Sequence, residues 1–260
     1  MIDRIATGIP GLDEMIGGGF ASGDVILITG SPGCGKTTFG LQYLYRGVAE
    51  HAEPGIFVTL EESPARTIRN AWQFGWDVER MIKENRIRII RADPVAYAHY
   101  IPDRKDSTPP AHVDIGSVMI ETLSTQIERL VNELGARRIF IDSITSLKIA
   151  QNEFQVRFAI LELIKNLENL DCTTVLSSEI CPGAESNGMF NVEEYLAEVV
   201  IRLHMFRSSG DRVRALEILK MRGGKHDETM RPYSITDSGL VVYPRETVID
   251  GAIISSVALL

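Results

Sequence analysis

The sequence predicts an α/β fold, in which a mostly parallel, twisted sheet is flanked by helices and followed by antiparallel strands near the C-terminus. Two observations support this prediction. Short β-rich runs alternate with helix-compatible segments up to Ala197, and this alternation is typical of a mostly parallel sheet covered on both faces. From Glu198 onward, closely spaced strand patterns separated by turn residues indicate hairpins.

The elements of the N-terminal part follow from local sequence. Val25–Ile28 is an uninterrupted apolar run, as expected for a buried strand, and Phe39–His51 is compatible with a helix. Ile56–Leu60 predicts the next strand, and Ser63-Pro64 predicts a helix start because proline is favoured in the first turn. Arg86–Arg91 is expected to form a short strand.

The central part begins with residues 92–114, which hold four prolines and little periodicity and therefore predict a loop or surface insertion. Two helices are then expected, separated by the strand Arg138–Asp142 and followed by the strand Thr173–Ser178. The apolar residues at helical spacing are Ile115, Met119, Leu123, Ile127, Leu130 and Leu134 in the first helix, and Phe154, Phe158, Leu161, Ile164 and Leu167 in the second.

The C-terminal part reads as two hairpins. Glu198–Phe206 and Arg212–Lys220 are joined by turn residues at 208–211, and Tyr233–Val242 contains a second turn at 237–239. The apolar segment Ile249–Leu260 is shorter than the ~18 residues of a membrane span and is expected to form a last strand or an interface segment.

Composition limits the domain count and the class of partner. The 260 residues, 44% of them hydrophobic, fit one large α/β domain over 1–260. The net charge of −8 argues against general nucleic-acid binding, which needs clustered Lys and Arg. Cys34, Cys172 and Cys181 are scattered and predict neither a disulfide framework nor a zinc site. The sequence shows no signal peptide and no membrane span, so a cytoplasmic location is expected.

The segment Asp24–Thr38 carries the clearest chemical signal. Its spacing Gly30-x4-Gly35-Lys36-Thr37 matches the Walker A pattern, placed between a strand and a helix as a phosphate-binding P-loop requires. Backbone amides of the glycine-rich loop would cradle the phosphates, Lys36 would reach the β- and γ-phosphates, and the Thr37 hydroxyl would ligate Mg²⁺. The residues expected to bind ATP are Ser31, Pro32, Gly33, Cys34, Gly35, Lys36, Thr37 and Thr38.

Carboxylates follow two other predicted strands. Asp142 ends the strand Arg138–Asp142, where an aspartate of a P-loop NTPase holds Mg²⁺ beside the P-loop hydroxyl; the alternative is a helix cap. Glu61 and Glu62 follow the strand Ile56–Leu60. Two adjacent glutamates at a strand edge cannot both point the same way, so one would polarise the attacking water while its neighbour packs or orients the first glutamate by hydrogen bonding. The alternative is a solvated surface pair.

Several motifs together resemble one family over nearly the whole chain. They are Thr7–Asp13 (TGIPGLD) with Gly17–Gly19, the P-loop, Glu61-Glu62, Phe74–Asp77 (FGWD), Val192–Glu194 (VEE) and Leu219–Gly223 (LKMRG). In this order they resemble the KaiC-like branch of the RecA-fold ATPases. The resemblance implies a RecA-type P-loop NTPase that hydrolyses ATP with Mg²⁺ and assembles into rings, commonly hexamers, with ATP between neighbouring subunits.

The resemblance also implies a role for two basic residues far from the P-loop. Lys220 and Arg222 match residues that reach the γ-phosphate of the adjacent subunit, where cations stabilise the charge that develops during phosphoryl transfer. Strand periodicity alone would instead give an exposed alternating strand. Residues Val192–Glu198 lack the neighbouring Ser and Thr of the clock protein's autophosphorylating domain, so autokinase activity is not favoured.

Two functional classes fit these observations. The first is a regulatory or signalling ATPase whose nucleotide-dependent ring recruits an as yet unknown protein partner. The alternative is a recombinase-related ATPase that binds DNA through the loops 143–153 and 180–197. These loops hold Lys148 as their only Lys or Arg, together with Glu153, Glu185, Glu193 and Glu194. Because DNA phosphates require cationic contacts, the first class is preferred.

Overall fold

The computed structural model describes residues 3–92, 115–148, 153–180, 192–208, 211–249 and 252–255. The predicted loop or insertion at 92–114 lies outside the described residues except for Ala92. None of the helices within these ranges is long and apolar enough to cross a membrane.

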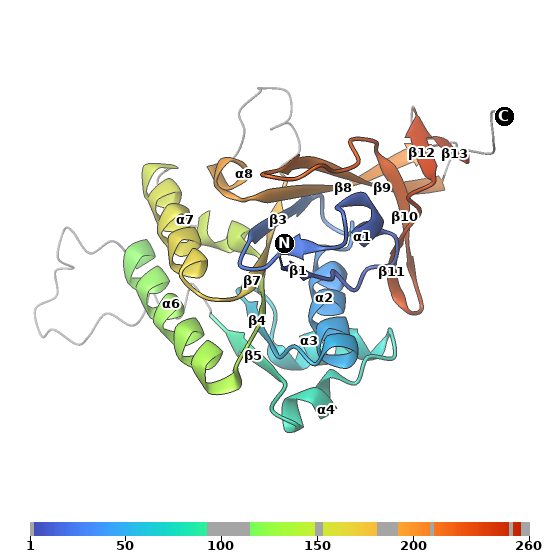
Figure 1. Ribbon diagram of the computed structural model, residues 1–260. Coiled ribbons are helices and arrows are strands. Elements are labelled where there is room, and N and C mark those ends of the chain that lie inside the picture. The colour runs from blue at the N-terminus through green and yellow to red at the C-terminus, as the bar shows by residue number, and fades with distance from the viewer. Residues whose placement is uncertain are drawn as a thin grey trace, which may run out of the picture.

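A nine-stranded sheet dominates the described part of the chain (Figure 1). Its strands, in spatial order, are β11 (Gly239–Val242), β10 (Arg231–Thr236), β9 (Asp211–Met221), β8 (Val199–Ser208), β3 (Val25–Gly30), β7 (Thr173–Glu179), β6 (Arg138–Asp142), β4 (Gly55–Thr59) and β5 (Ile87–Arg91). The strands from β8 to β5 pair in parallel, and those from β8 to β11 pair antiparallel. The predicted mostly parallel sheet with C-terminal antiparallel strands is confirmed.

Helices cover both faces of the sheet, which explains why β3 and β4 are buried along their whole length. One face packs against α2 (Lys36–His51), α3 (Pro64–Trp72) and α4 (Val78–Lys83). The opposite face packs against α6 (Ile115–Leu134) and α7 (Glu153–Glu168). The sheet therefore separates two hydrophobic clusters.

The smaller elements lie at the ends of the chain and around the sheet edge. They are β1 (Arg4–Ile5), α1 (Leu12–Met15), β2 (Phe20–Ala21), the 3₁₀ helix η1 (Ile144–Lys148), α8 (Val192–Leu196), β12 (Glu246–Ile249) and β13 (Ala252–Ser255). β12 and β13 form a separate hairpin, so part of the apolar C-terminal segment is indeed a strand.

Helix α7 has the predicted position, but the apolar residues that mark it differ in burial. Ile164 and Leu167 are buried, whereas Phe158 is 53% exposed and Leu161 is only partly buried. Ala159, Ile160 and Leu163 are buried as well. The helical spacing of apolar residues thus predicts the helix without specifying which of its apolar residues reach the core.

Gln42 joins the two ends of the chain to the helix after the P-loop. Its amide accepts a hydrogen bond from the Leu240 N–H at 2.6 Å and donates to the carbonyls of Leu240 and Gly8, both at 3.0 Å. The side chain is almost fully buried, so each of these bonds satisfies a group that water cannot reach. Gln42 thereby holds β11 and the N-terminal segment against α2.

Replacing Gly40 of α2 with alanine is expected to destabilise the fold. A Cβ at this position would overlap the ring of Phe140, which is buried on the facing strand β6. In an unobstructed helix the same change would stabilise by about 0.5–1 kcal/mol, but overpacking a core costs about 1–3 kcal/mol, so the net effect should be a loss. Urea unfolding of Gly40→Ala measures it, and adding Phe140→Leu should recover part of the loss. Equal or greater stability in the single variant would contradict the packing argument.

Candidate functional site

A cavity of about 330 Å³ opens at the carboxyl ends of the parallel strands, beside the start of α2. Loops at this edge of an α/β sheet commonly form ligand sites. Its lining residues are Pro32, Gly33, Gly35, Lys36, Thr37, Thr38, Thr59, Glu61, Glu62, Asp142, Ser143, Glu179 and Ile235. The structure thus brings together residues from the P-loop, from the ends of β4, β6 and β7, and from β10.

The glycines of the P-loop serve two different needs. Gly33 and Gly35 have φ angles of 80° and 103°, a left-handed conformation that other residues adopt at a cost. Gly30 has no such φ angle; a Cβ there would lie 2.6 Å from both the Cys34 sulfur and the Leu203 carbonyl oxygen. Gly33 and Gly35 therefore permit the turn of the loop, and Gly30 permits its close packing on β8.

Of the eight loop residues expected to bind ATP, Ser31 and Cys34 are not among those that line the cavity. The Cys34 side chain is fully buried, and burial raises the pKa of its thiol. Ser31 contributes its backbone carbonyl, which accepts a hydrogen bond from Lys36. The main chain of these two residues can still shape the loop.

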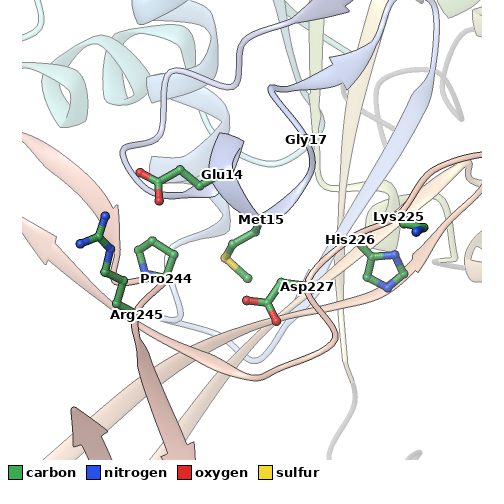
Figure 2. Close-up of a pocket in the computed structure, with 8 residues that line it drawn as sticks. All are labelled: Glu14, Met15, Gly17, Lys225, His226, Asp227, Pro244 and Arg245. Atoms are coloured by element: carbon green, nitrogen blue, oxygen red, sulfur yellow. The ribbon is translucent and has the colours of Figure 1, made fainter. Parts of the chain in front are cut away.

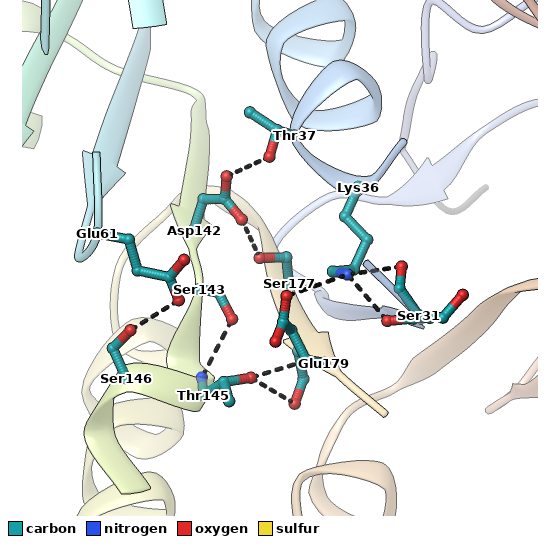
Figure 3. A network of polar contacts seen from close by, with 12 residues as sticks. Ser31, Lys36, Thr37, Glu61, Asp142, Ser143, Thr145, Ser146, Ser177 and Glu179 are labelled. Carbon is teal, nitrogen blue, oxygen red and sulfur yellow. Dashed lines mark hydrogen bonds and ion pairs between the residues drawn. The ribbon is translucent and has the colours of Figure 1, made fainter. Parts of the chain in front are cut away.

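Lys36 is the central cation of the cavity. It is only 7% exposed, and its ammonium donates to the carbonyls of Gly30 at 2.8 Å and Ser31 at 3.2 Å. The Glu179 carboxylate lies 3.9 Å away (Figure 3). A cation held this close to the loop is suitably placed to bind a phosphate that the loop amides cradle.

Thr37 and Asp142 form the pair of oxygen donors that a magnesium ion would require. The Thr37 hydroxyl donates to Asp142 Oδ2 at 2.7 Å, and Ser177 donates to Oδ1 at 2.5 Å. Burial raises the pKa of the Asp142 carboxyl, while the two hydrogen bonds lower it. Mg²⁺ prefers one or two carboxylates, a hydroxyl and phosphate or water oxygens, and this donor set fits it.

Both glutamates after β4 line the cavity, and their carboxylates have partners on different elements. Glu61 accepts a hydrogen bond from Ser146 at 2.7 Å, and Glu62 accepts one from Asn70 at 3.3 Å. Ser146 belongs to η1 and Asn70 to α3, which pack on opposite faces of the sheet, so the expectation that the two side chains do not point the same way agrees with these contacts. Each carboxylate is therefore oriented by a different helix.

Sequence reasoning did not select Glu179, Ser177 or Thr145. Strand β7 lies between β3 and β6, which places Ser177 beside Asp142 and Glu179 beside Gly30. The Thr145 hydroxyl accepts a hydrogen bond from the Glu179 backbone N–H at 2.7 Å (Figure 3). The available signal was a carboxylate at the carboxyl end of a predicted strand. The order of the strands, which places this carboxylate beside the P-loop, cannot be read from the sequence.

Lys220 and Arg222 lie outside the residues that line the P-loop cavity of their own chain. Lys220 donates to the carbonyls of Glu194 and Tyr195, and Arg222 donates to the Tyr195 carbonyl at 2.6 Å. Burial lowers the pKa of the Lys220 ammonium, and the neighbouring Arg222 charge lowers it further. Their shared acceptor shows that both side chains extend toward the end of α8.

The C-terminal strands support the P-loop from the side. The Tyr233 hydroxyl of β10 donates to the Cys34 carbonyl at 2.5 Å, and the tyrosine is buried. Ile235 lines the cavity and packs beside Gly35. The antiparallel strands therefore form one wall of the candidate site.

A second cavity of about 400 Å³ lies near α1 and the turn after β9 (Figure 2). It is lined by Glu14, Met15, Gly17, Lys225, His226, Asp227, Pro244 and Arg245. It is lined by both acidic and basic side chains, and Asp227 Oδ2 accepts a hydrogen bond from Arg231 Nε at 2.7 Å. The P-loop cavity, with its converging cation, hydroxyl and carboxylates, is the stronger candidate.

The comparison with known proteins agrees with this geometry. A family model described as "ATPase: KaiC" matches residues 5–247. The chain belongs to the KaiC family of ATPases. A KaiC-like protein from Pyrococcus horikoshii has a solved structure that superimposes with a TM-score of 0.78 and 34% identity, covering 94% of this chain and 100% of that one.

Two relatives differ in how much of their own length the chain matches. A UPF0273 protein of Methanocaldococcus jannaschii is 36% identical over 241 residues, which cover 93% of this chain and 96% of its own. The circadian clock oscillator protein KaiC of Synechococcus elongatus is 33% identical over 244 residues, but these cover only 44% of that protein. The chain is thus a KaiC-like ATPase of the RecA superfamily that spans less than half of the clock protein.

Proposed function

We propose that this chain hydrolyses Mg-ATP and works as a nucleotide-dependent ring, most simply a homohexamer, with a regulatory or signalling role in the cytoplasm. The observation that carries the proposal is the hydrogen bond between Thr37 and Asp142, facing Lys36 and two glutamates across one cavity. These are the groups that bind a nucleoside triphosphate, hold its metal ion and activate water. Family membership supports the nucleotide as ATP.

The proposed reaction is the attack of water on the γ-phosphorus of ATP. Mg²⁺, held by Thr37 and Asp142, would neutralise charge on the phosphate oxygens. Glu62, with Glu61 as the nearly equal alternative, accepts a proton from the attacking water. The oxygen of this water bonds to the γ-phosphorus while the bond between the γ-phosphorus and the leaving oxygen of ADP breaks. Lys36 stabilises the charge on the transferred group, and Lys220 and Arg222 do so at the site of the adjacent subunit.

The DNA-binding alternative receives no comparable support from the described residues. Two glutamates of the second candidate DNA loop are buried in α8, where Glu193 accepts a hydrogen bond from Ser178 and Glu194 pairs with Arg202. Because both are buried, these two glutamates add little to the surface charge of the loop, and the argument against DNA rests on its lack of Lys and Arg. Residues 149–152 and 181–191 of the two loops lie outside the described part.

The glutamate assignment is tested by isosteric substitution. Glu62→Gln is expected to preserve ATP binding and slow hydrolysis by about 10²-fold or more, because the amide cannot accept the proton from water. Glu61→Gln should have a smaller effect. Steady-state phosphate release measures hydrolysis, and calorimetry with a non-hydrolysable ATP analogue measures binding.

Glu133→Gln provides the control, since it removes an exposed carboxylate of α6 whose ion pair within the described residues is with Arg129, at 3.3 Å. Its turnover should equal that of the wild type. Normal turnover in Glu61→Gln, in Glu62→Gln and in the double variant would show that the two glutamates form a surface pair and that the proposed mechanism is wrong.

A further inference from the structure

Glu179 stands apart from the other carboxylates of the cavity because it faces the P-loop lysine. Its Oε1 lies 3.9 Å from the Lys36 ammonium, and its side chain is 39% exposed toward the cavity that it lines. The distance exceeds that of a hydrogen bond, so the contact is an electrostatic one. We propose that Glu179 sets the preference of this site between nucleoside triphosphates and diphosphates, by sharing Lys36 with the γ-phosphate. This inference rests on the proposed function.

The position of Glu179 is fixed by the main chain. It pairs with Gly30 across the parallel strands β7 and β3, so its backbone lies beside the first residue of the P-loop. The Glu179 N–H donates to Thr145 Oγ1 at 2.7 Å, which anchors the end of β7 to η1. A carboxylate on such an anchored strand end cannot move far from Lys36 without rotating its own side chain.

Within the described part of the chain, the Lys36 ammonium donates hydrogen bonds to two carbonyls and has one carboxylate as an ion-pair partner. The carbonyls of Gly30 and Ser31 are neutral dipoles, whereas Glu179 is an acidic side chain. A γ-phosphate bound at Lys36 would bring further negative charge close to this carboxylate. Like charges at this separation repel, and the low exposure of Lys36 reduces screening by solvent.

The consequence is specific to the third phosphate. In a P-loop the α- and β-phosphates are held chiefly by backbone amides, and the lysine reaches the β- and γ-phosphates. Glu179 therefore weakens binding of the triphosphate more than binding of the diphosphate. After hydrolysis the same repulsion favours departure of the inorganic phosphate, so the residue limits how tightly substrate and cleaved phosphate are retained.

The test measures two dissociation constants by calorimetry at constant ionic strength, one for the Mg²⁺ complex of a non-hydrolysable ATP analogue and one for Mg-ADP. Glu179→Gln keeps the shape and removes the charge. The ratio of the ADP constant to the analogue constant is expected to rise about threefold or more, as for loss of a partly exposed charge interaction. Glu179→Ala should also raise the ratio, and it replaces Glu179→Gln in the test if the glutamine variant is poorly folded.

Two further variants separate charge from structure. Glu179→Asp retains the negative charge and should keep the ratio closer to the wild-type value than Glu179→Gln does. Glu133→Gln removes one charge from the exposed face of α6 and should leave the ratio unchanged. A merely structural role of Glu179 would weaken both nucleotides together and would not change their ratio.

The outcomes distinguish this inference from the proposed function. A wild-type chain that binds neither nucleotide would refute the proposed function itself. A wild-type chain that binds both, with a ratio that stays constant or falls in Glu179→Gln and Glu179→Ala, would refute the role of Glu179 alone. An aspartate variant that behaves like the glutamine variant would also overturn the inference, because charge would then not be the property that matters.

Discussion

Replacement of Lys36 with alanine is expected to reduce ATP hydrolysis by at least about 10²-fold, the size of effect seen when one stabilising group is removed from a preorganised site. The ammonium is 7% exposed and lies within hydrogen-bond distance of two P-loop carbonyls, so a nearby water could not replace its charge at the γ-phosphate. The loss should appear in steady-state phosphate release at saturating Mg-ATP.

Lys83 offers the matched control for this experiment. It lies on α4, its side chain is 73% exposed, and it pairs with Glu79 at 3.0 Å. Lys83→Ala removes the same group and charge at a distance from the P-loop cavity and should keep full activity. If Lys36→Ala hydrolyses ATP at the wild-type rate while remaining folded, the P-loop is not the site of hydrolysis and the proposed function fails.

Mixing two inactive variants is expected to restore activity if Arg222 acts on the adjacent subunit. A Lys36→Ala subunit retains its basic residues, and an Arg222→Ala subunit retains its P-loop. In randomly mixed rings with equal amounts of each, about a quarter of the interfaces would join an intact P-loop to an intact Arg222, because the interface is heterologous. Phosphate release should therefore rise to about a quarter of the wild-type rate, whereas each variant alone should be nearly inactive.

The cis contacts of Arg222 require a control. Its guanidinium donates to the Tyr195 carbonyl and pairs with Glu198 at 3.4 Å, so alanine also removes contacts near α8. Glu198→Gln removes that ion pair and retains the guanidinium; it should keep most of the activity. Mass measurements must first show that mixed rings form. If they form and no activity returns, Arg222 acts within its own subunit or supports the fold.

The main strands could be predicted from sequence because each combines an apolar run with flanking turn residues. The observed β4, β5 and β6 match their predicted ranges within one residue. The short elements were missed for a physical reason: α1 and α8 have four and five residues, too few for a periodic pattern, and they form through contacts with the rest of the fold. Phe158 shows the related limit, since the helical spacing of apolar residues does not specify which of them reach the core.

Some residues of the candidate site could be predicted from the sequence, and others could not. Lys36 and Thr37 were found because the Walker A motif places them at the start of a helix, and Asp142 was found because it ends a predicted strand; the structure brings the three together. Glu179 was not found, because its position beside the P-loop depends on β7 lying between β3 and β6. The different partners of Glu61 and Glu62, Ser146 and Asn70, agree with the expectation that the two side chains do not point the same way. Local sequence thus indicates which residues reach the edge of the sheet, whereas the order of the strands decides which of them meet.

The Gln42 amide has a consequence for shortened forms of the chain. Its partners, Gly8 and Leu240, are 34 and 198 residues away along the sequence. A fragment that stops before residue 240 would leave two of the three hydrogen bonds of this amide without a partner. The helix that carries Lys36 and Thr37 therefore depends on a distant strand for its support.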